Sequence, residues 1–397
     1  MSFRLVATTL LLACAVHAQI SVAAQVWATT GGTARGFTAV VDLTDPRLDI
    51  HVTDPLNPPQ SYESVLETTL NWHTRNNLQL SINANYFGTF TATTADIVGV
   101  SKSAGFLVSP IRQFGAAPDP ALVIGINRIA TIGNITASQA ASAWWAVAGV
   151  GPSTTDTVPG TLLVTDGVNT GSTARVDPLN RNPRTAIGTN ALGTLLYIVV
   201  VDGRQTGWSV GMTLPETANV LLGMGAYRAI NLDGGGSTSL IWSPPGGSLV
   251  QNRPSGGTHR AVANHLGFSL GPTGVVTVGA SCGGAGIISG AGDFRLGSTN
   301  FAVQLQGAPA GSLPFLALGF PGSETTCGAC AFVNAASYSY VPLTGSAASW
   351  QWLLPSNPTF VGTVVGSQWL LLQTASAACS NAPGLAATAR LHMALGL

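Results

Sequence analysis

Apolar and polar positions follow two different periods in the first two thirds of the chain. A continuous apolar, β-branched run from Leu195 to Val201 has the composition of a strand that is buried on both faces. Apolar residues recur four positions apart between Ser61 and Arg75, which predicts a helix with one apolar face. A second helix is predicted from about Leu214 to Met224. Further strands are predicted at residues 37–43, 48–52, 78–83, 229–232, 237–242 and 262–270.

This order of elements predicts an α/β (α+β) domain with a mixed sheet over residues 19–272. Several polar motifs of the domain directly follow predicted strands. Ligand sites of α/β sheets usually lie at the carboxyl ends of buried strands. We therefore expect the functional site of this domain at those strand ends.

From about residue 273 the pattern changes to short alternating runs, such as Phe301–Gln306, separated by Gly, Pro and Ser. The turn-forming segment Gly271–Gly274 precedes the change. The pattern predicts a small all-β sandwich over residues 273–397, for which we expect a non-catalytic accessory role. The charged residues of this region are Asp293, Arg295, Glu324 and Arg390.

The N-terminus has the pattern of an export signal over residues 1–18. Arg4 supplies the positive charge, Leu5–Ala13 is apolar, and Val16-His17-Ala18 is a small-x-small cleavage pattern ahead of Gln19. A secreted or periplasmic protein is therefore expected. Lipoprotein anchoring at Cys14 is the alternative. No other stretch resembles a membrane span.

Removal of that signal leaves an even number of cysteines, all of them in the predicted C-terminal domain. An even number in an exported chain predicts two disulfides, and the sequence allows three connectivities. A zinc site is the alternative, because Cys327 and Cys330 have ligand spacing. The four residues are Cys282, Cys327, Cys330 and Cys379.

Composition and charge exclude some partners. Hydrophobic residues make up 46% of the chain, which is ample for packed cores. Charged residues make up only 8% and the net charge is zero, so neither nucleic acid nor an anionic membrane is an expected partner. We expect no cofactor, because His259 and His265 do not have the spacing of metal ligands. A Ca²⁺ ion near the candidate acids Asp202 and Asp233 is the alternative, although no calcium-binding loop of known spacing is present.

The strongest chemical motif is a glycine-rich turn after a predicted strand. Asp233 ends the strand as a candidate base, acid or nucleophile, and three glycines let the backbone turn and approach a ligand closely. Free N–H groups of such a turn can form an anion-binding nest. The alternative is a tight hairpin capped by the Asp. The candidate site residues of this segment are Asn231, Asp233, Gly234, Gly235, Gly236, Ser237 and Thr238.

Four further residues are candidates on weaker patterns. Asp202 follows the buried strand, and Arg204 beside it has the geometry to grip a phosphate. Arg184 enters a predicted strand, where a buried guanidinium needs an anionic partner from the protein or the substrate. Asn85, at another strand end, is a candidate donor to sugar hydroxyls. Surface pairing explains Asp202 and Arg204 equally well, and core packing is an alternative for the segment around Asn85.

Glu216 is a third candidate acid, and it also has a structural explanation. In Thr213-Leu-Pro-Glu216 the threonine fits a helix N-cap whose backbone N–H the glutamate side chain reaches. The pattern thus predicts a capping box at the start of the second helix, and that role competes with catalysis.

Taken in order, these motifs resemble the phosphodiester glycosidase family. The resemblance spans roughly residues 35–270 and implies a catalytic domain that hydrolyses a sugar-1-phosphodiester, releasing free sugar and a phosphomonoester. It implies a small-molecule or polysaccharide sugar-phosphate substrate without naming the sugar. The matching segments are Asn85–Phe87, Pro183–Gly188, Asp202–Gln205, Gly211–Glu216, Asn231–Ser237 and Asn252–Ser255.

For this reaction we expect Arg184, Arg204 and the Gly234–Ser237 turn to hold the phosphate. Asp233 or Asp202 would face the sugar as base or nucleophile. One alternative is a non-catalytic protein that holds a cell-surface glycan in the same cleft. Another is a hydrolase with Ser237 as nucleophile, although no Gly-x-Ser-x-Gly pattern or paired histidine supports it.

Overall fold

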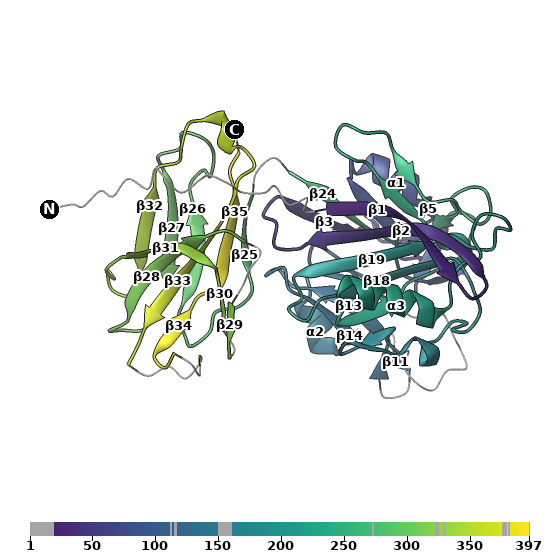
Figure 1. Ribbon diagram of the computed structural model, residues 1–397, viewed down its shortest axis with the longest axis horizontal. Coiled ribbons are helices and arrows are strands. Elements are labelled where there is room, and N and C mark those ends of the chain that lie inside the picture. Colours follow the sequence, from purple (N-terminus) through teal and green to yellow (C-terminus); the bar gives the residue numbers. More distant parts are fainter. Residues whose placement is uncertain are drawn as a thin grey trace. The chain divides into compact units, whose positions relative to one another are not determined.

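The computed structural model describes residues 20–396 except 112, 115–116, 150–160, 272–273, 322–324, 329, 375–378 and 380–381. The predicted export signal and Cys14 lie outside the described residues. The chain forms two compact units (Figure 1). The N-terminal unit contains Ile20–Thr44 and Leu48–Gly271, and the C-terminal unit contains Asp45–Arg47 and the chain that follows Gly271.

The N-terminal unit is built on a twisted seven-stranded sheet. The second strand of the long hairpin at its start pairs with β19 (Leu195–Val201), which is covered on both faces. On one face Leu196, Ile198 and Val200 enter the main hydrophobic core, and on the other Val199 and Val201 pack with the helix α3 (Leu214–Met224). In order, the strands are β1 (Ile20–Thr29), β2 (Gly32–Asp42), β19 (Leu195–Val201), β18 (Arg184–Thr189), β20 (Arg228–Asn231), β16 (Val164–Thr165) and β17 (Val168–Asn169).

Two five-stranded sheets contribute the other side of the main core. The first runs β10 (Phe106–Ser109), β9 (Ser101–Ser103), β15 (Trp145–Ala148), β13 (Pro120–Ile124), β14 (Ala130–Asn134). The second runs β22 (Val250–Gln251), β21 (Leu240–Trp242), β6 (Leu80–Asn83), β24 (His265–Leu270), β3 (Leu48–Val52).

The remaining elements of this unit are short. The helices and 3-10 turns are α1 (Thr69–Arg75), α2 (Ala137–Ser142), η1 (Gly171–Thr173) and η2 (Gly235–Ser237). The short strands are β4 (Ser64–Val65), β8 (Thr94–Ile97) and β7 (Phe87–Phe90) in one sheet, and the pairs β5 (Glu67–Thr68) with β23 (Ala261–Val262) and β11 (Gln113–Phe114) with β12 (Ala117–Pro118).

The structure corrects the predicted fold class in two respects. The unit is mostly β-sheet with few helices, and every pairing between named strands in the described residues is antiparallel, so its sheets are not mixed. The apolar run of β19 correctly indicated burial on two faces, but burial does not specify the direction of the neighbouring strands. The helix predicted over residues 61–75 is shorter, because Ser64–Val65 and Glu67–Thr68 pair as strands and only Thr69–Arg75 is helical.

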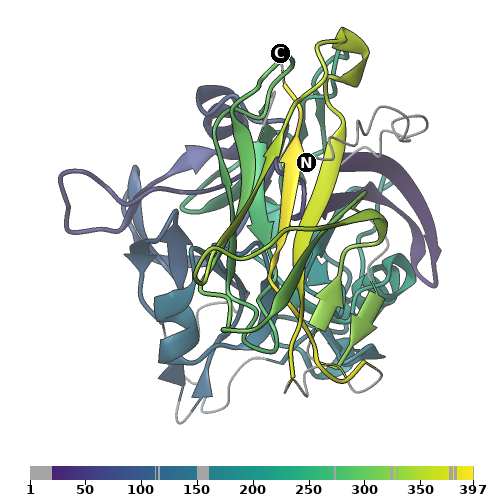
Figure 2. The same cartoon turned by 90° about the vertical axis from the view of Figure 1, so that its left-hand side faces the viewer.

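The C-terminal unit consists of strands in two main sheets that enclose its own core (Figure 2). Phe301, Leu316 and Trp369 are fully buried between them. One sheet runs β25 (Gly274–Val278), β35 (Arg390–Ala394), β33 (Val364–Leu372), β28 (Leu313–Gly319), β31 (Ala335–Tyr340), with β34 (Leu385–Ala387) on β33. The other runs β26 (Ile287–Ala291), β27 (Phe301–Gln306), β32 (Ala348–Trp352), and a 3-10 turn η3 (Pro358–Phe360) follows.

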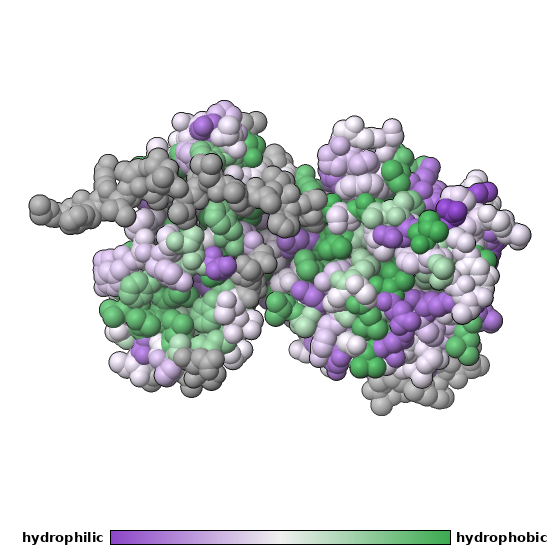
Figure 3. Space-filling view, viewed as in Figure 1, coloured by the Kyte–Doolittle hydropathy of each residue, from purple (hydrophilic) through white to green (hydrophobic). Residues whose placement is uncertain are grey.

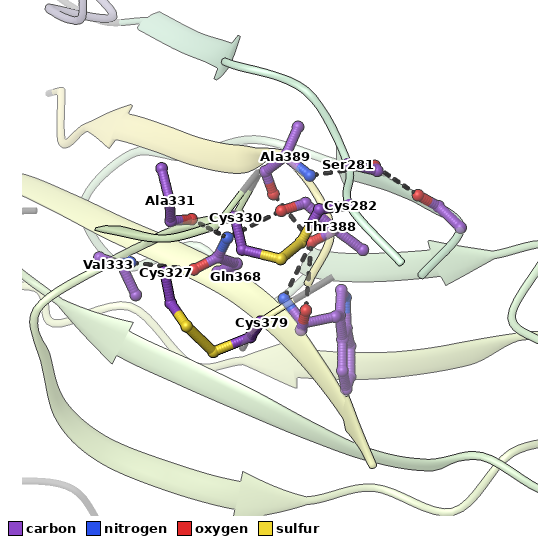
Figure 4. The surroundings of a disulfide bond; sticks show 12 residues. Ser281, Cys282, Cys327, Cys330, Ala331, Val333, Gln368, Cys379, Thr388 and Ala389 are labelled. Carbon is purple, nitrogen blue, oxygen red and sulfur yellow. Dashed lines mark hydrogen bonds between the residues drawn. A yellow bond between two sulfur atoms is a disulfide. The ribbon is translucent and has the colours of Figure 1, made fainter. Parts of the chain in front are cut away.

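All four cysteines of this unit form disulfides (Figure 4). Cys282 bonds Cys330, and Cys327 bonds Cys379, so the two cysteines with zinc-ligand spacing enter different bridges. They lie on the hairpin of β29 (Thr325–Cys327) and β30 (Cys330–Phe332). Beside them the buried Gln368 amide accepts from Val333 N and donates to the carbonyls of Ala331 and Thr388. The predicted disulfides are therefore present, and they replace the zinc alternative.

Within the residues that the structure describes, no helix is both long enough and apolar enough to span a membrane.

Candidate functional site

The glycine-rich turn lies directly after β20, which pairs with β18 through Asn231. The backbone N–H of Asp233 donates to Ala84 O at 3.0 Å, and Asn83 Nδ2 donates to Asp233 O at 2.6 Å. The end of β6 thus fixes the position of Asp233. Gly235 follows with a φ of +60°, a left-handed conformation that favours glycine. Local sequence therefore sets the turn, and a neighbouring sheet anchors it.

Asp233 carries the most informative pKa of the site. The residue as a whole is half-buried, and desolvation of its carboxyl raises the pKa to about 6. A hydrogen bond from the Ser237 side chain, the positive charge of Arg260 and the Gly234 N–H act in the opposite direction and keep the pKa from rising further. A carboxyl with such a pKa exchanges protons near neutral pH, as general acid–base chemistry requires.

Two exposed arginines lie on the glycine turn. A Cβ added to Gly235 would stand 3.3 Å from Arg204 Nη1. A Cβ added to Gly236 would stand 3.9 Å from Arg260 Cδ. Arg260 Nη1 also donates to Ser237 Oγ at 3.3 Å. Neither arginine forms an ion pair with a carboxylate within the described residues. The backbone of the glycine turn therefore has two guanidinium groups beside it, those of Arg204 and Arg260.

The predicted nest of backbone N–H groups is largely occupied. The N–H of Gly235 donates to Pro183 O, that of Ser237 to Gly234 O, and that of Thr238 to Gly235 O, at 2.9, 3.1 and 3.3 Å. These bonds hold the turn in its shape. The groups available to an anion are thus the arginine side chains more than the backbone of Gly234–Ser237.

Asn231 and Thr238 bring unpaired polar atoms to this region. Asn231 Nδ2 donates to the hydroxyl of Tyr86 at 2.8 Å, whereas Asn231 Oδ1 and Thr238 Oγ1 are buried and have no hydrogen-bond partner among the described residues. Burial, and then the nearby Asp233 charge, raises the pKa of Tyr86. The Tyr86 hydroxyl, which accepts from Asn231, is thus within the electrostatic influence of the Asp233 carboxyl.

Asp202 is buried and bound by protein donors. Its Oδ2 accepts from Trp208 Nε1 at 3.0 Å, and its Oδ1 accepts from Asn252 Nδ2 at 3.1 Å and from Arg253 N at 3.0 Å. Desolvation raises its pKa, and these three donors counteract that rise. Asn252 Nδ2 also donates to Thr238 O, so Asp202 links two loops to the end of the glycine turn.

The structure gives Arg184 a structural role. Its guanidinium is buried and donates to four backbone carbonyls, from Nε to Met212 O and from Nη1 and Nη2 to Val176 O, Asp177 O and Asn180 O. Carbonyl dipoles thus supply the negative partner that the sequence required. This geometry does not favour the predicted binding of a substrate phosphate by Arg184.

Asn85 is likewise fully engaged inside the protein. It is 1% exposed. Its Nδ2 donates to Val98 O and Val100 O at 3.0 and 3.1 Å, and its Oδ1 accepts from Ala148 N and Asn264 Nδ2. No atom of its amide is left for a sugar hydroxyl. Asn85 therefore ties β6 to neighbouring segments instead of lining a site.

Glu216 forms the capping box that the sequence indicated. Its Oε2 accepts from Thr213 N at 2.9 Å, and Thr213 Oγ1 accepts from Glu216 N at 3.2 Å. Its other oxygen pairs with Arg181 at 2.5 Å. One carboxylate oxygen thus caps α3 and the other pairs with Arg181, and this geometry does not favour a catalytic role for Glu216.

Sequence reasoning missed Arg260 and the cluster around Trp208. The ring of Trp208 lies between the guanidinium groups of Arg35 and Arg253, at 4.7 and 5.2 Å from its centroid. Arg35, Trp208 and Arg260 lie outside the motifs, and Arg253 lies in the Asn252–Ser255 segment but was not a candidate. Arginines in a chain with so few charges are themselves a signal. The described residues contain no group of three or more His, Cys, Asp or Glu that could hold a metal ion.

Comparison with known proteins concerns the family of the N-terminal unit. Residues 76–269, which lie within the N-terminal unit, match the family model described as phosphodiester glycosidase. The resemblance seen in the sequence is thereby confirmed. No curated protein matches the chain.

Solved structures that match include the catalytic domain of a zebrafish enzyme, N-acetylglucosamine-1-phosphodiester α-N-acetylglucosaminidase, auto-inhibited by its pro-peptide. It is 20% identical, with a TM-score of 0.47, over 63% of this chain and 82% of that chain. A hypothetical protein from Synechocystis matches at 16% identity and a TM-score of 0.45, over 64% of this chain and 62% of its own length. A protein from Burkholderia pseudomallei K96243 matches at 18% identity and a TM-score of 0.43, over 61% of this chain and 75% of its own.

Proposed function

We propose that this protein hydrolyses sugar-1-phosphodiesters by cleaving the bond between the anomeric carbon and the phosphate oxygen. One observation carries the proposal: Asp233, with a pKa of about 6, begins a glycine turn that lies beside Arg204 and Arg260. The family match of residues 76–269 supports the same reaction class.

The two arginines would bind the phosphodiester. A guanidinium forms charge-assisted hydrogen bonds to phosphate oxygens, and its planar set of donors suits their geometry. Gly235 and Gly236 have no side chain between the backbone and these groups, so the phosphate can lie against the turn. As the bond to the sugar breaks, negative charge grows on the leaving oxygen, and the two guanidinium groups stabilise it there.

Asp233 would activate the attacking water. The ionised carboxylate takes a proton from water, the water oxygen forms a bond to the anomeric carbon, and the electron pair of the broken bond goes to the phosphate oxygen. The products are free sugar and a phosphomonoester. Because a phosphomonoester leaves without prior protonation, one carboxyl base with positive charge opposite it is sufficient. A pKa near 6 makes Asp233 largely ionised at neutral pH and still basic enough to accept a proton.

In this proposal the Ser237 hydroxyl links the Asp233 carboxyl to Arg260 and does not act as a nucleophile. Its hydroxyl contacts both the Asp233 carboxyl and Arg260 Nη1. The nearby His259 is bonded to Ser239 Oγ through Nδ1 and to Gln251 Oε1 through Nε2, so its contacts are with other residues. A serine hydrolase needs a base on its nucleophile, and the described contacts of Ser237 include no such histidine.

The same proposal assigns Asp202, Arg184 and Asn85 to holding the loops around the turn. Disulfides form and persist in oxidising compartments, so we also place the protein outside the cytoplasm, secreted or periplasmic. We assign the C-terminal unit an accessory role, separate from the chemistry.

The test is product analysis on a panel of sugar-1-phosphodiesters that includes N-acetylglucosamine-α-1-phosphodiester. Asp233→Asn is the test variant, and Asp166→Asn, which changes an exposed acid paired with Arg228, is the matched control. Free sugar plus phosphomonoester from wild type and control, but not from Asp233→Asn, supports the proposal. Turnover by Asp233→Asn removes Asp233 from the mechanism. Binding without cleavage of any substrate by wild type favours the non-catalytic glycan-binding alternative.

A further inference from the structure

Two further arginines lie near the candidate site, and both contact the ring of one tryptophan. The guanidinium carbon of Arg35 is 4.7 Å from the centroid of the Trp208 ring, and that of Arg253 is 5.2 Å from it. Arg35 Nε also donates to Trp208 O at 3.2 Å. A guanidinium over a ring uses its face for that contact and keeps N–H groups at its edge for other partners. These three residues form an arginine–tryptophan stack.

The stack is held in place by Asp202, which follows β19. Its Oδ2 accepts from Trp208 Nε1 at 3.0 Å, its Oδ1 accepts from Arg253 N at 3.0 Å, and its backbone N–H donates to Arg35 O at 2.8 Å. Every member of the stack is thus bound to one buried residue. The fold therefore positions the two guanidinium groups in advance, which reduces the entropy lost when they bind a ligand.

The stack and the Asp233 turn lie along one edge of the seven-stranded sheet. β2, β19, β18 and β20 are consecutive antiparallel neighbours, so β19 and β20 run in the same direction and end at the same edge. Arg35 precedes the point at which β2 pairs with the last residue of β19, Asp202 follows β19, and Asp233 follows β20. Neighbouring strands are about 4.8 Å apart, so Asp202 and Arg35 lie roughly 10 and 14 Å along this edge from Asp233. Asn252 Nδ2 links the two groups, because it donates to both Asp202 Oδ1 and Thr238 O.

Positive charge without an ion-pair partner is concentrated at this edge. Charged residues make up only 8% of the chain, so such a concentration is not a general property of its surface. In the view of Figure 3, strongly hydrophilic residues gather on the N-terminal unit, and few appear on the C-terminal unit. The arginines of this edge that form no ion pair with a carboxylate of the described chain are Arg35, Arg204, Arg253 and Arg260.

The acids near these arginines do not balance their charge. Three acids act electrostatically on the group, and the buried Arg184 adds a fifth positive charge to it. Even with every acid ionised, an excess of two positive charges remains, and an anionic ligand would neutralise it. The three acids are Asp177, Asp202 and Asp233.

We propose that the substrate carries a second anionic group on its aglycone, and that Arg35 and Arg253 bind this group. The inference rests on the proposed hydrolysis and names the class of aglycone. Arg204 follows β19 and therefore lies between Asp233 and the stack along the edge. With the sugar at Asp233 and the cleaved phosphate at Arg204, the aglycone extends toward the stack.

The separation along the edge indicates what lies between the two anionic groups. Two to three strand spacings leave room for one sugar residue or a short polyol. Phosphates or carboxylates at such intervals occur in polymers of repeating phosphodiesters and of uronic acids, and both groups suit the planar donors of a guanidinium. The substrate class is thus a polyanionic glycosyl phosphodiester.

The first experiment measures binding without chemistry, by isothermal titration calorimetry of the full mature chain. The probes are hexyl phosphate, hexane-1,6-diol bisphosphate and 6-phosphonooxyhexanoate, which carries a carboxylate in place of the second phosphate. None of them contains a sugar, so the proposed reaction cannot consume them. The test variants are Arg253→Gln, at an exposed position, and Arg35→Gln. The matched control is Arg75→Gln, which removes an exposed arginine paired with Glu67.

We expect at least one of the two probes with a second anionic group to bind about tenfold more tightly than hexyl phosphate, as a second set of charge-assisted hydrogen bonds implies. Arg253→Gln and Arg35→Gln should each remove most of this preference, and Arg75→Gln should keep it. Preference for the bisphosphate identifies a second phosphate, and preference for the carboxylate probe identifies a uronic acid. Equal affinity for all three probes, or a preference that survives both stack variants, would overturn the proposal.

The second experiment separates this inference from the proposed hydrolysis. N-acetylglucosamine-α-1-phosphate esterified with hexane-1,6-diol is compared with the same ester phosphorylated at its far hydroxyl. A higher kcat/KM for the phosphorylated ester, with a smaller preference in Arg253→Gln, supports both proposals. Equal hydrolysis of the two esters upholds the reaction and counts against the second anion site. Selective binding of the bisphosphate without hydrolysis of either ester upholds the anion site and counts against the reaction.

Discussion

Arg260 donates from Nη1 to Ser237 Oγ at 3.3 Å, and the Ser237 hydroxyl in turn hydrogen-bonds the Asp233 carboxyl. Arg260 also lies over the ring of Phe87, at 4.9 Å from its centroid. The positive charge lowers the pKa of Asp233 against the larger effect of desolvation. Arg260 thus has two expected effects, one on the phosphate and one on the base.

Arg260→Ala should reduce kcat/KM about 10- to 1,000-fold, because the charge on the leaving phosphate loses one guanidinium. It should also move the acidic limb of the pH–rate profile to higher pH, because the pKa of Asp233 rises when the positive charge is removed. Arg260→Lys should restore the position of that limb. The measurement is kcat/KM across pH 4–8. Arg75→Ala is the control, since Arg75 is an exposed arginine paired with Glu67. A limb that does not move in Arg260→Ala would contradict the coupling.

Asp233→Asn should abolish turnover and stabilise the fold at neutral pH. The folded pKa of Asp233 is raised to about 6, so its contribution to stability is present below the unfolded pKa and is lost as pH rises through about 6. An asparagine avoids that loss. We expect a gain in the free energy of unfolding on the order of 1–2 kcal/mol at pH 7.5 that disappears near pH 4. Urea denaturation at both pH values tests this, and equal effects at both would argue against the raised pKa.

Arg184→Met should destabilise the N-terminal unit, because four carbonyl partners lose their donor. A loss of about 2–4 kcal/mol is expected, as for a buried charged hydrogen-bond network. Arg184→Lys should recover little, because one ammonium group cannot reproduce the planar set of donors. Arg204→Ala is the contrast: activity should fall while stability changes little. Thermal and urea unfolding of the three variants decide this. A stable but inactive Arg184→Met protein would instead return Arg184 to substrate binding.

The disulfides close loops of 48 and 52 residues in the C-terminal unit. Chain-entropy arguments give about 4 kcal/mol for each loop of that length. Replacing Cys282 and Cys330 by Ser, or Cys327 and Cys379, should lower the stability of that unit by up to this amount. Limited proteolysis should then cut beyond residue 273 first. Hydrolysis by the N-terminal unit should persist in freshly prepared protein. Unchanged protease resistance in both variants would show that the bridges are dispensable.

Two buried histidines predict a loss of stability in acid. Burial lowers the pKa of His73 to about 4 and that of His265 to about 3, and His265 stacks on Trp72 at 4.9 Å. Both folded pKa values are depressed, so their contribution is present above the unfolded pKa of about 6.5 and is lost as pH falls toward 4 and 3. The free energy of unfolding should therefore fall between pH 6.5 and 4. His73→Gln should flatten that fall, and an equally steep profile in the variant would assign the acid sensitivity to other groups.

Local sequence was sufficient for features that depend on neighbouring residues. The apolar run of Leu195–Val201 indicated a strand buried on both faces, and Thr213 and Glu216 indicated the capping box of α3. The glycine turn after Asn231 was equally readable. In each case the signal is a spacing along the chain, which the backbone geometry of one element or turn converts directly into structure.

Only the tertiary structure showed which polar residues contact one another and how the strands run. These features depend on residues that are far apart in the chain. Arg260 reaches Ser237 across 23 positions, and Asn252 reaches Asp202 across 50. Sequence indicated that a buried Arg184 needs a negative partner, but only the fold shows that backbone carbonyls provide it. The direction of the strands beside β19 is equally invisible in its composition, since apolar residues respond to burial and not to strand polarity. The sequence determined which segments are buried and where the turn lies, while long-range packing chose which polar groups remain available for chemistry.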